Sequence, residues 1–197
     1  MLLAEQIHAF QPTDDRESRS RDTILEHLAA HPGDPFSRDH LAGHLTASAL
    51  VVSADGERVL LGHHRKLGRW LQFGGHGDPG ETDAADVAMR EALEESGIEG
   101  LKFHPTAARP FDLDVHKIPA RGDVPEHNHL DIRYLMVARD GAVPAMREAE
   151  HLELRWFTWD ETSNLGTDVA LTRFLAKARV ATALLLTARP NVSTPPA

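Results

Sequence analysis

The spacing of apolar and polar positions divides the chain into an N-terminal helical extension and a domain that contains both strands and helices. Between residues 14 and 31, Ile24, Leu25, Leu28 and Ala29 recur at a helical spacing among charged residues, and a Pro- and Gly-rich segment follows at residues 32–35. From residue 44 onward, runs of β-forming residues predict strands at 44–53, 59–62, 70–73, 101–104, 111–116, 130–138 and 154–158. Helical patterns predict further helices near 83–96 and 168–187.

These elements predict an α+β fold in which a mixed β-sheet is sandwiched between helices. The strands and helices do not alternate strictly, so a doubly wound parallel sheet is not expected. We predict an N-terminal helical extension at residues 1–43, a main domain at 44–188 and a polar tail at 189–197.

Composition narrows the class of protein. The chain has 197 residues, 41% of them hydrophobic and 26% charged, which is ordinary for a globular protein. Its formal net charge of -9 argues against nucleic acid as a partner, and it predicts that an anionic ligand would come with divalent cations. The chain has no cysteine, no membrane-length apolar run and no visible secretory leader, so we expect a cytoplasmic protein.

The most informative segment is residues 74–98. Gly74 to Glu81 is rich in Gly and Pro, which predicts a tight loop. A helix is expected to follow, with Thr82 or Asp83 as its N-cap and Gly97 as a left-handed C-terminal cap.

One edge of that helix gathers acidic residues. At about 100° per residue, Glu91, Glu94 and Glu95 fall within roughly one 100° arc. Such carboxylates repel one another, and hard cations such as Mg²⁺ or Mn²⁺ would offset the repulsion. Arg90 is placed to pair with Glu94 one turn further on.

The whole segment resembles the signature of the Nudix hydrolases, in which a glycine and a glutamate precede the run Arg-Glu-apolar-x-Glu-Glu-x-Gly-apolar. The matching positions are Gly75, Glu81, Arg90, Glu91, Glu94, Glu95, Gly97 and Ile98. Eight residues rather than seven separate Glu81 from Arg90, and we place the extra residue in the turn before the helix.

The resemblance implies metal-dependent hydrolysis of a phosphoanhydride bond in a nucleoside diphosphate linked to another moiety, or in a related diphosphate. It implies metal binding by Glu91, Glu94 and Glu95 with Gly75 and Glu81, and catalytic roles for Arg90 and Glu91. Glu94 or Glu95 would orient or deprotonate the water. Outside this segment, a further ligand or base could come from Glu148, Glu150 or Glu153, although exposed loop charges are the simpler interpretation of these three.

A second candidate site is rich in histidine. The alternation of residues 127–136 places His127, His129, Asp131 and Arg133 on the face opposite Leu130, Ile132, Tyr134 and Met136. His44, His76, His129 and Asp131 resemble the metal site of the isopentenyl-diphosphate isomerases, and such ligands suit a transition metal. Gly74 stands where those enzymes have a catalytic cysteine, which argues against isomerase chemistry. A hydrogen-bonded strand pair of His129 and Asp131, with His76 in a loop, is the alternative.

Other residues next to the loop are candidates for substrate binding. Arg65 and Arg69 could steer an anion, or form a solvated hairpin end, and Trp70 could stack on a base or lie in the core. The expected partner is a small diphosphate, with neither nucleic acid nor membrane, and a homodimer is retained as an expectation. The alternative functions are another metal-dependent reaction on a diphosphate at the histidines, or a non-catalytic ligand sensor.

Overall fold

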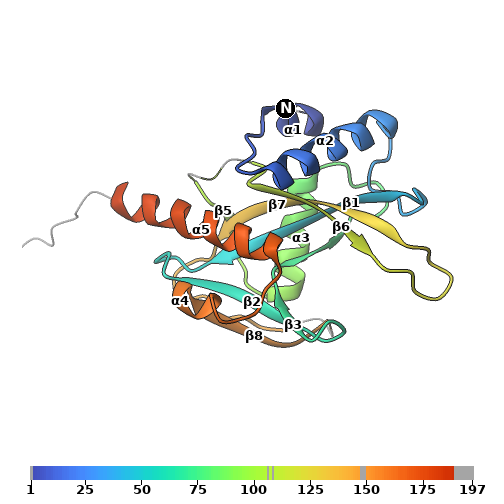
Figure 1. The fold of residues 1–197 in the computed structure, drawn as a ribbon. Coiled ribbons are helices and arrows are strands. Elements are labelled where there is room, and N and C mark those ends of the chain that lie inside the picture. Colours follow the sequence, from blue (N-terminus) through green and yellow to red (C-terminus); the bar gives the residue numbers. More distant parts are fainter. Residues whose placement is uncertain (1, 106, 108, 147–149, 189–197) are drawn as a thin grey trace, which may run out of the picture.

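The fold centres on a mixed eight-stranded sheet, shown in Figure 1 as a computed structural model that describes residues 2–105, 107, 109–146 and 150–188. The strands are β1 (Gly43–Val52), β2 (Arg58–His64), β3 (Arg69–Leu71), β4 (Phe73–His76), β5 (Lys102–Phe103), β6 (Asp112–Ile118), β7 (His127–Val137) and β8 (His151–Thr158). The helices are α1 (Leu3–Ala9), α2 (Asp15–Ala30), α3 (Ala84–Ser96), α4 (Trp159–Thr162) and α5 (Val169–Ala188).

Strand β1 organises the sheet. It pairs in parallel with β7 from Gly43 to Val52, whereas its other side is divided between β4 and the start of β2. The remaining strand pairs are antiparallel, and β7 also pairs with β5 and β6. This arrangement brings β4 and β7, which are distant from β1 in the sequence, next to its first half.

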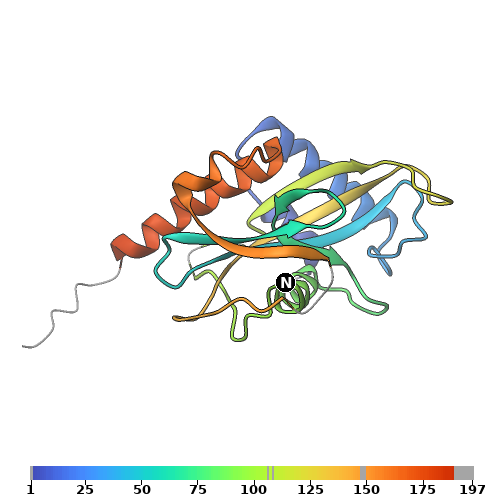
Figure 2. The same cartoon turned by 90° about the horizontal axis from the view of Figure 1, so that it is seen from below.

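Helices α3 and α5 cover opposite faces of the sheet (Figure 2). On the α3 face, Leu130, Ile132 and Tyr134 of β7 enter the main apolar core, as their alternation predicted. On the α5 face, Leu135 packs in a second apolar cluster with Phe174. The expectation of an α+β sheet sandwiched between helices is therefore confirmed.

The N-terminal helices pack against the domain rather than standing apart from it. Ile7, Phe10 and Ile24 are buried in the core that also contains α3. The sequence predicted α2 but not the seven-residue α1, because a helix of two turns shows too little periodicity to be recognised. The four-residue α4 was missed for the same reason. The boundary at residues 43/44 stays a prediction, and the predicted tail at 189–197 lies outside the described residues.

One predicted loop is a strand in its first part. Residues 74–76 belong to β4 and pair with Thr46, Ala47 and Ser48 of β1. The Gly-rich loop prediction was therefore wrong for these residues, because long-range pairing decides their conformation. Gly74 is needed for that pairing, since a Cβ there would lie 2.3 Å from the Cβ of Ser48.

A layer of buried charges joins the sheet to the helices near β6. Arg133, 3% exposed, contacts Asp131 at 2.7 Å and Asp112 and Asp114 at 3.4 Å each. Arg173 and Lys177 of α5 also bind Asp112, and Lys177 binds Glu17 of α2. Buried carboxylates of this kind are tolerated because each has a cationic partner.

Low pH should weaken this layer of buried charges by protonating the carboxylate of Asp114. Burial by itself would raise the pKa of Asp114, but the hydrogen bond with His116 and the charge of Arg133 lower it from 3.8 to about 2. Because the folded-state pKa lies below the ordinary value, the stabilisation is present above about pH 4 and is lost as the pH falls toward 2. Asp114→Asn should therefore reduce the free energy of unfolding by about 2 kcal/mol at pH 7.

Urea unfolding at pH 7 and at pH 3 measures this effect. The difference between the wild type and Asp114→Asn should shrink clearly at pH 3, whereas the exposed control Asp123→Asn should match the wild type at both values. An undiminished difference at pH 3 would show that the ionised carboxylate is not the source of the stabilisation.

Candidate active site

Helix α3 is delimited by the two caps that the sequence predicted. The side chain of Asp83 accepts a hydrogen bond from the backbone N–H of Ala85 at 2.8 Å, and Gly97 takes a left-handed conformation at φ +63°. Val87, Ala88 and Ala92 bury one side of the helix in the core. The adjacent side therefore points its carboxylates toward β4.

Arg90 gathers the acidic groups of this segment. Its Nε and Nη2 atoms bind the two carboxylate oxygens of Glu81 at 3.1 and 2.9 Å. Its Nη1 binds Glu91 at 2.9 Å and Glu94 at 3.1 Å, and Nη2 also donates to the backbone carbonyl of His76. The extra residue before the helix therefore leaves Glu81 in direct contact with Arg90.

Glu91 lies directly beneath strand β4. A Cβ on Gly75 would stand 2.8 Å from Oε1 of Glu91, so any other residue here would push this carboxylate away from the strand. Burial raises the pKa of Glu91 to about 7, with the charges of Glu95 and Glu94 adding to the effect and Arg90 opposing it. A carboxylate in this position gains stability from a cation placed beside it.

Glu95 has a different environment, which the sequence did not reveal. It is buried, and Oε2 accepts hydrogen bonds from Nε2 of His151 at 3.0 Å and from the backbone N–H of Gly74 at 3.3 Å. Burial raises the pKa of Glu95, and the hydrogen bond from His151 counteracts that rise. A Cβ on Gly62 would lie 2.4 Å from the His151 ring, so a glycine on β2 makes room for it.

A cleft of about 310 Å³ opens beside Glu95. Its walls come from α3 and from all strands but β5, and they include Thr46, Ser48, His64, Leu67, Leu71, Gln72, Gly74, Gly75, His76, His116, Ile118, His129, Asp131, Glu150 and His151. Glu150 was one of the three acids considered outside the signature segment, and it lines this cleft. Glu153 is exposed, and Glu148 lies outside the described residues.

Comparison with known proteins identifies the family. The model of the NUDIX domain matches residues 43–178. The chain belongs to the Nudix family. A search of the curated proteins found no match.

Solved structures of Nudix proteins share this fold. An Ap4A hydrolase from C. elegans, solved as a binary complex, is 21% identical with a TM-score of 0.57, over 71% of this chain and 97% of its own. A hydrolase of the NUDIX family from Clostridium perfringens is 26% identical with a TM-score of 0.53, over 72% and 97% of the two chains. The prediction of a Nudix hydrolase is thus confirmed.

The residues predicted to bind substrate lie beside the cleft of this Nudix hydrolase, not on its walls. Trp70 packs edge-on against Phe157, with ring centroids 4.8 Å apart, next to the second apolar cluster. Arg69 pairs with Asp168 at 3.8 Å. Arg65 is exposed, and its backbone N–H bonds the carbonyl of Glu150. Their neighbours Leu67 and Leu71 line the cleft instead, so the interpretation of Trp70 as a packing residue fits the structure better.

Five histidines of the Nudix domain, on β1, β4, β6 and β7, form a cluster. The ring centroid of His44 lies about 5 Å from those of His76, His127 and His129, and His116 lies 5.6 Å from His129. Burial, together with His76 and His127, lowers the pKa of His44 to about 4. Burial, followed by the neighbouring histidines, lowers the pKa of His129 to about 2. The imidazoles of His44 and His129 are therefore neutral at physiological pH.

The histidine site in the structure does not consist of the same residues as the predicted one. Asp131 does not join the rings, because its carboxylate binds Arg133 at 2.7 Å, Ser48 at 2.8 Å and Thr46 at 3.2 Å. The alternative of a hydrogen-bonded pair of His129 and Asp131 does not match these contacts either. His76 lies on β4 near His44 and His129, and His127 completes the closest group.

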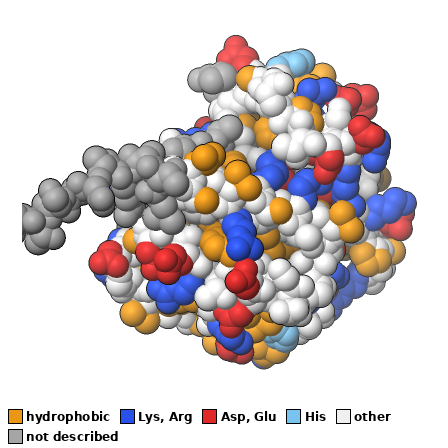
Figure 3. Space-filling view, turned by 60° about the vertical axis from the view of Figure 1, so that its left-hand side comes forward, with side chains coloured by type: hydrophobic (Ala, Val, Ile, Leu, Met, Phe, Trp, Pro, Cys, Tyr) orange, Lys and Arg blue, Asp and Glu red, His pale blue; other side chains and the backbone are white. Residues whose placement is uncertain are grey.

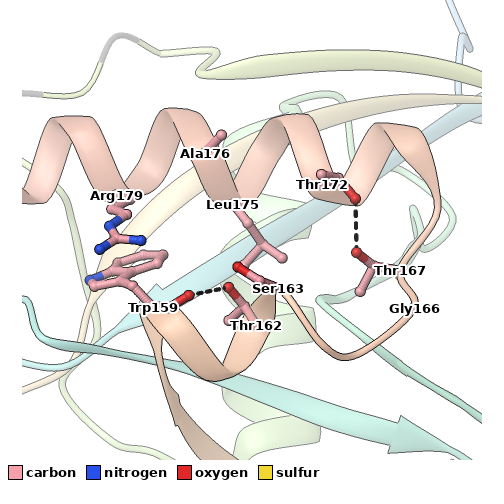
Figure 4. A pocket seen from close by; sticks show the side chains of 9 residues that line it. All are labelled: Trp159, Thr162, Ser163, Gly166, Thr167, Thr172, Leu175, Ala176 and Arg179. Atoms are coloured by element: carbon pink, nitrogen blue, oxygen red, sulfur yellow. Dashed lines mark hydrogen bonds between the residues drawn. The ribbon is translucent and has the colours of Figure 1, made fainter.

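Two other surfaces of the Nudix hydrolase have fewer groups that could bind a metal or take part in catalysis. A pocket of about 240 Å³ between α4 and α5 contains neither a carboxylate nor an imidazole (Figure 4); it is lined by Trp159, Thr162, Ser163, Gly166, Thr167, Thr172, Leu175, Ala176 and Arg179. On the face drawn in Figure 3, basic and acidic side chains are interspersed, so that face presents no broad basic surface. Within the described residues, no helix has the length and apolar character needed to cross a membrane.

Proposed function

We propose that this Nudix hydrolase cleaves a phosphoanhydride bond in a nucleoside diphosphate linked to another moiety, or in a related diphosphate, with Mg²⁺ or Mn²⁺ as its cofactor. The observation that carries the proposal is the arrangement around Arg90. One guanidinium group holds Glu81, Glu91 and Glu94, while Glu95 on the same helix lines the adjacent cleft.

The residues fit a hard divalent cation. Glu91, Glu94 and Glu95 offer carboxylate oxygens, with Gly75 next to Glu91 and Glu81 bound to the same arginine, and Mg²⁺ and Mn²⁺ prefer oxygen ligands. The raised pKa of buried Glu91 supports the same assignment, since a cation would offset the cost of its burial. When bound, such ions neutralise phosphate oxygens and activate water.

The protein's own side chains would orient the acidic groups and the attacking water. Arg90 orients Glu91 and Glu94 and fixes the loop through Glu81 and the carbonyl of His76. His151 and the backbone N–H of Gly74 hold Glu95 in one orientation. Glu94 or Glu95 is our candidate for orienting or deprotonating the attacking water, because both adjoin the place where the metal would be held.

Two further proposals concern the setting of the enzyme. The chain has no cysteine, which supports a protein that works in the cytoplasm without disulfides. A homodimer is the oligomer we propose, and size-exclusion chromatography with light scattering would show whether the mass is that of two chains.

A substrate panel with and without divalent cations tests the proposed reaction. The panel contains sugar nucleotides, dinucleotides, coenzyme A, damaged nucleotides and a prenyl diphosphate, each assayed after chelation and after addition of Mg²⁺ or Mn²⁺. We expect turnover only with a cation present. Glu94→Gln should lower kcat on the best substrate by about 10²-fold or more, the usual contribution of a positioned base.

Glu57→Gln is the matched control, because Glu57 is exposed in the turn between β1 and β2 and should leave kcat unchanged. Full turnover by Glu94→Gln would remove Glu94 from the site. Cation-independent turnover by the chelated protein would refute the metal-dependent mechanism.

A further inference from the structure

The parallel pairing of β1 and β7 builds a row of histidines that is separate from the acidic helix. His44 is opposite His129 in that register, and His129 is opposite His116 on β6. His127 precedes His129 by two residues, so it lies on the same face of β7. Ring nitrogens of His44, His127 and His129 all lie within 4.8 Å of one another, and no other group of three potential ligands meets this criterion among the described residues.

His44 has no hydrogen-bond partner for either ring nitrogen, although its side chain is buried with only 4% of the residue exposed. A buried imidazole normally satisfies at least its N–H, because leaving a polar group unpaired in the interior costs roughly 1–3 kcal/mol. The rings of His127 and His129 are its neighbours, but their positions give it no hydrogen bond. A group bound between the three rings would account for this unpaired side chain.

His127 is already oriented as a ligand would be. Its Nδ1 bonds the backbone carbonyl of Pro125 at 2.9 Å, which requires the proton on Nδ1 and leaves Nε2 with a free lone pair. Histidines that bind metals commonly donate their second nitrogen to a backbone carbonyl or carboxylate in this manner, which fixes both the tautomer and the ring plane.

We propose that His44, His127 and His129 bind a divalent transition metal ion such as Zn²⁺. Three imidazole ligands with an open fourth position form a coordination set that zinc adopts in catalytic sites, whereas Mg²⁺ disfavours it. The three rings border a cavity of about 380 Å³ that also contains Arg38 and Arg121. The open position faces a cavity whose arginines suit an anionic group, such as a phosphate or carboxylate, as the added ligand.

This site is distinct from the acidic site, and it does not depend on the proposed function. None of its ligands belongs to α3, and its donors are nitrogens instead of carboxylate oxygens. His76 and His129 also line the cleft next to Glu95, so the two sites adjoin one another across the same end of the sheet.

Metal binding by the full-length protein tests the proposal without any substrate. The chelated protein is titrated with Zn²⁺ by calorimetry, and with Co²⁺ while the visible absorption of the bound ion is recorded. We expect one equivalent to bind at the histidines, in addition to any ion at the acidic site, with a Co²⁺ spectrum typical of nitrogen ligands. His127→Ala should weaken binding by more than the roughly 10–100-fold that loss of a mere supporting partner costs.

Three variants make the result decisive. His8→Ala removes an exposed histidine on α1 and should bind like the wild type, and Glu94→Gln should keep the nitrogen-type spectrum. His76→Ala separates our ligand set from the alternative that uses His76, and we expect the Co²⁺ spectrum to persist. Circular dichroism confirms that each variant is folded. Unchanged Zn²⁺ affinity in folded His127→Ala, or loss of the spectrum in His76→Ala but not in His127→Ala, would overturn the proposal.

Discussion

Glu91→Gln is expected to lower kcat for the best diphosphate substrate by at least about 10³-fold, because cation assistance contributes several kcal/mol and each 1.36 kcal/mol is tenfold in rate. Glu91 is more tightly enclosed than Glu94. Its side chain is 15% exposed, between Arg90 and the backbone of Gly75, whereas that of Glu94 is 43% exposed. The loss in Glu91→Gln should therefore exceed the loss in Glu94→Gln.

The measurement is kcat at saturating substrate and saturating Mg²⁺, with Glu57→Gln as the control. The amide keeps the size of the side chain, so a fold change is not expected, and circular dichroism verifies this. A variant that regains full turnover merely at higher Mg²⁺ would show that Glu91 contributes to affinity only. A larger loss in Glu94→Gln than in Glu91→Gln would contradict the order predicted from their burial.

Arg133→Met should destabilise the fold by about 3–5 kcal/mol, the usual result of removing one partner from a buried charge network. Arg133 is the shared cation of Asp112, Asp114 and Asp131, all of which are almost completely buried. Without it, the carboxylate of Asp131 would keep, among the described residues, only the hydroxyl groups of Thr46 and Ser48 as partners. Methionine fills a similar volume, so the loss would reflect charge and not a cavity.

Urea unfolding at pH 7 gives the free energy directly. Arg19→Met is the matched control, because Arg19 is exposed on α2, and it should stay within about 0.5 kcal/mol of the wild type as surface substitutions do. Arg133→Lys should recover part of the loss, since lysine restores the charge but not the planar geometry. A loss below about 1 kcal/mol in Arg133→Met would show that the aspartates do not depend on this arginine.

The sequence predicted those parts of the site that local patterns determine. The caps Asp83 and Gly97 act within a few residues, and the pairing of Arg90 with Glu94 needs only one helical turn. Alternation along β7 correctly separated the apolar face from the polar one. Each of these features depends on neighbours in the chain, so they could be predicted without knowing the topology.

The features that were missed depend on long-range pairing. His151 meets Glu95 only because β8 pairs with β2 at a glycine, Gly62, that leaves room for the ring. His127 joins His44 through the parallel register of β1 and β7, which no local pattern specifies. The strand conformation of Gly74 to His76 likewise comes from β1, against the local preference of glycine for a loop.

The ion pairs of Lys177 with Glu17 and Asp112 have a consequence for how far the chain can be truncated. Lys177 pairs with Glu17 of helix α2 and with Asp112 of strand β6. Ile7 of α1 and Ile24 of α2 lie in the main apolar core. A chain truncated to residues 43–178, the range that the family model matches, would expose part of that core to solvent. It would also leave Lys177 without its ion-pair partner Glu17. We therefore expect stable folding to require α1 and α2 as well as the residues that the family model matches.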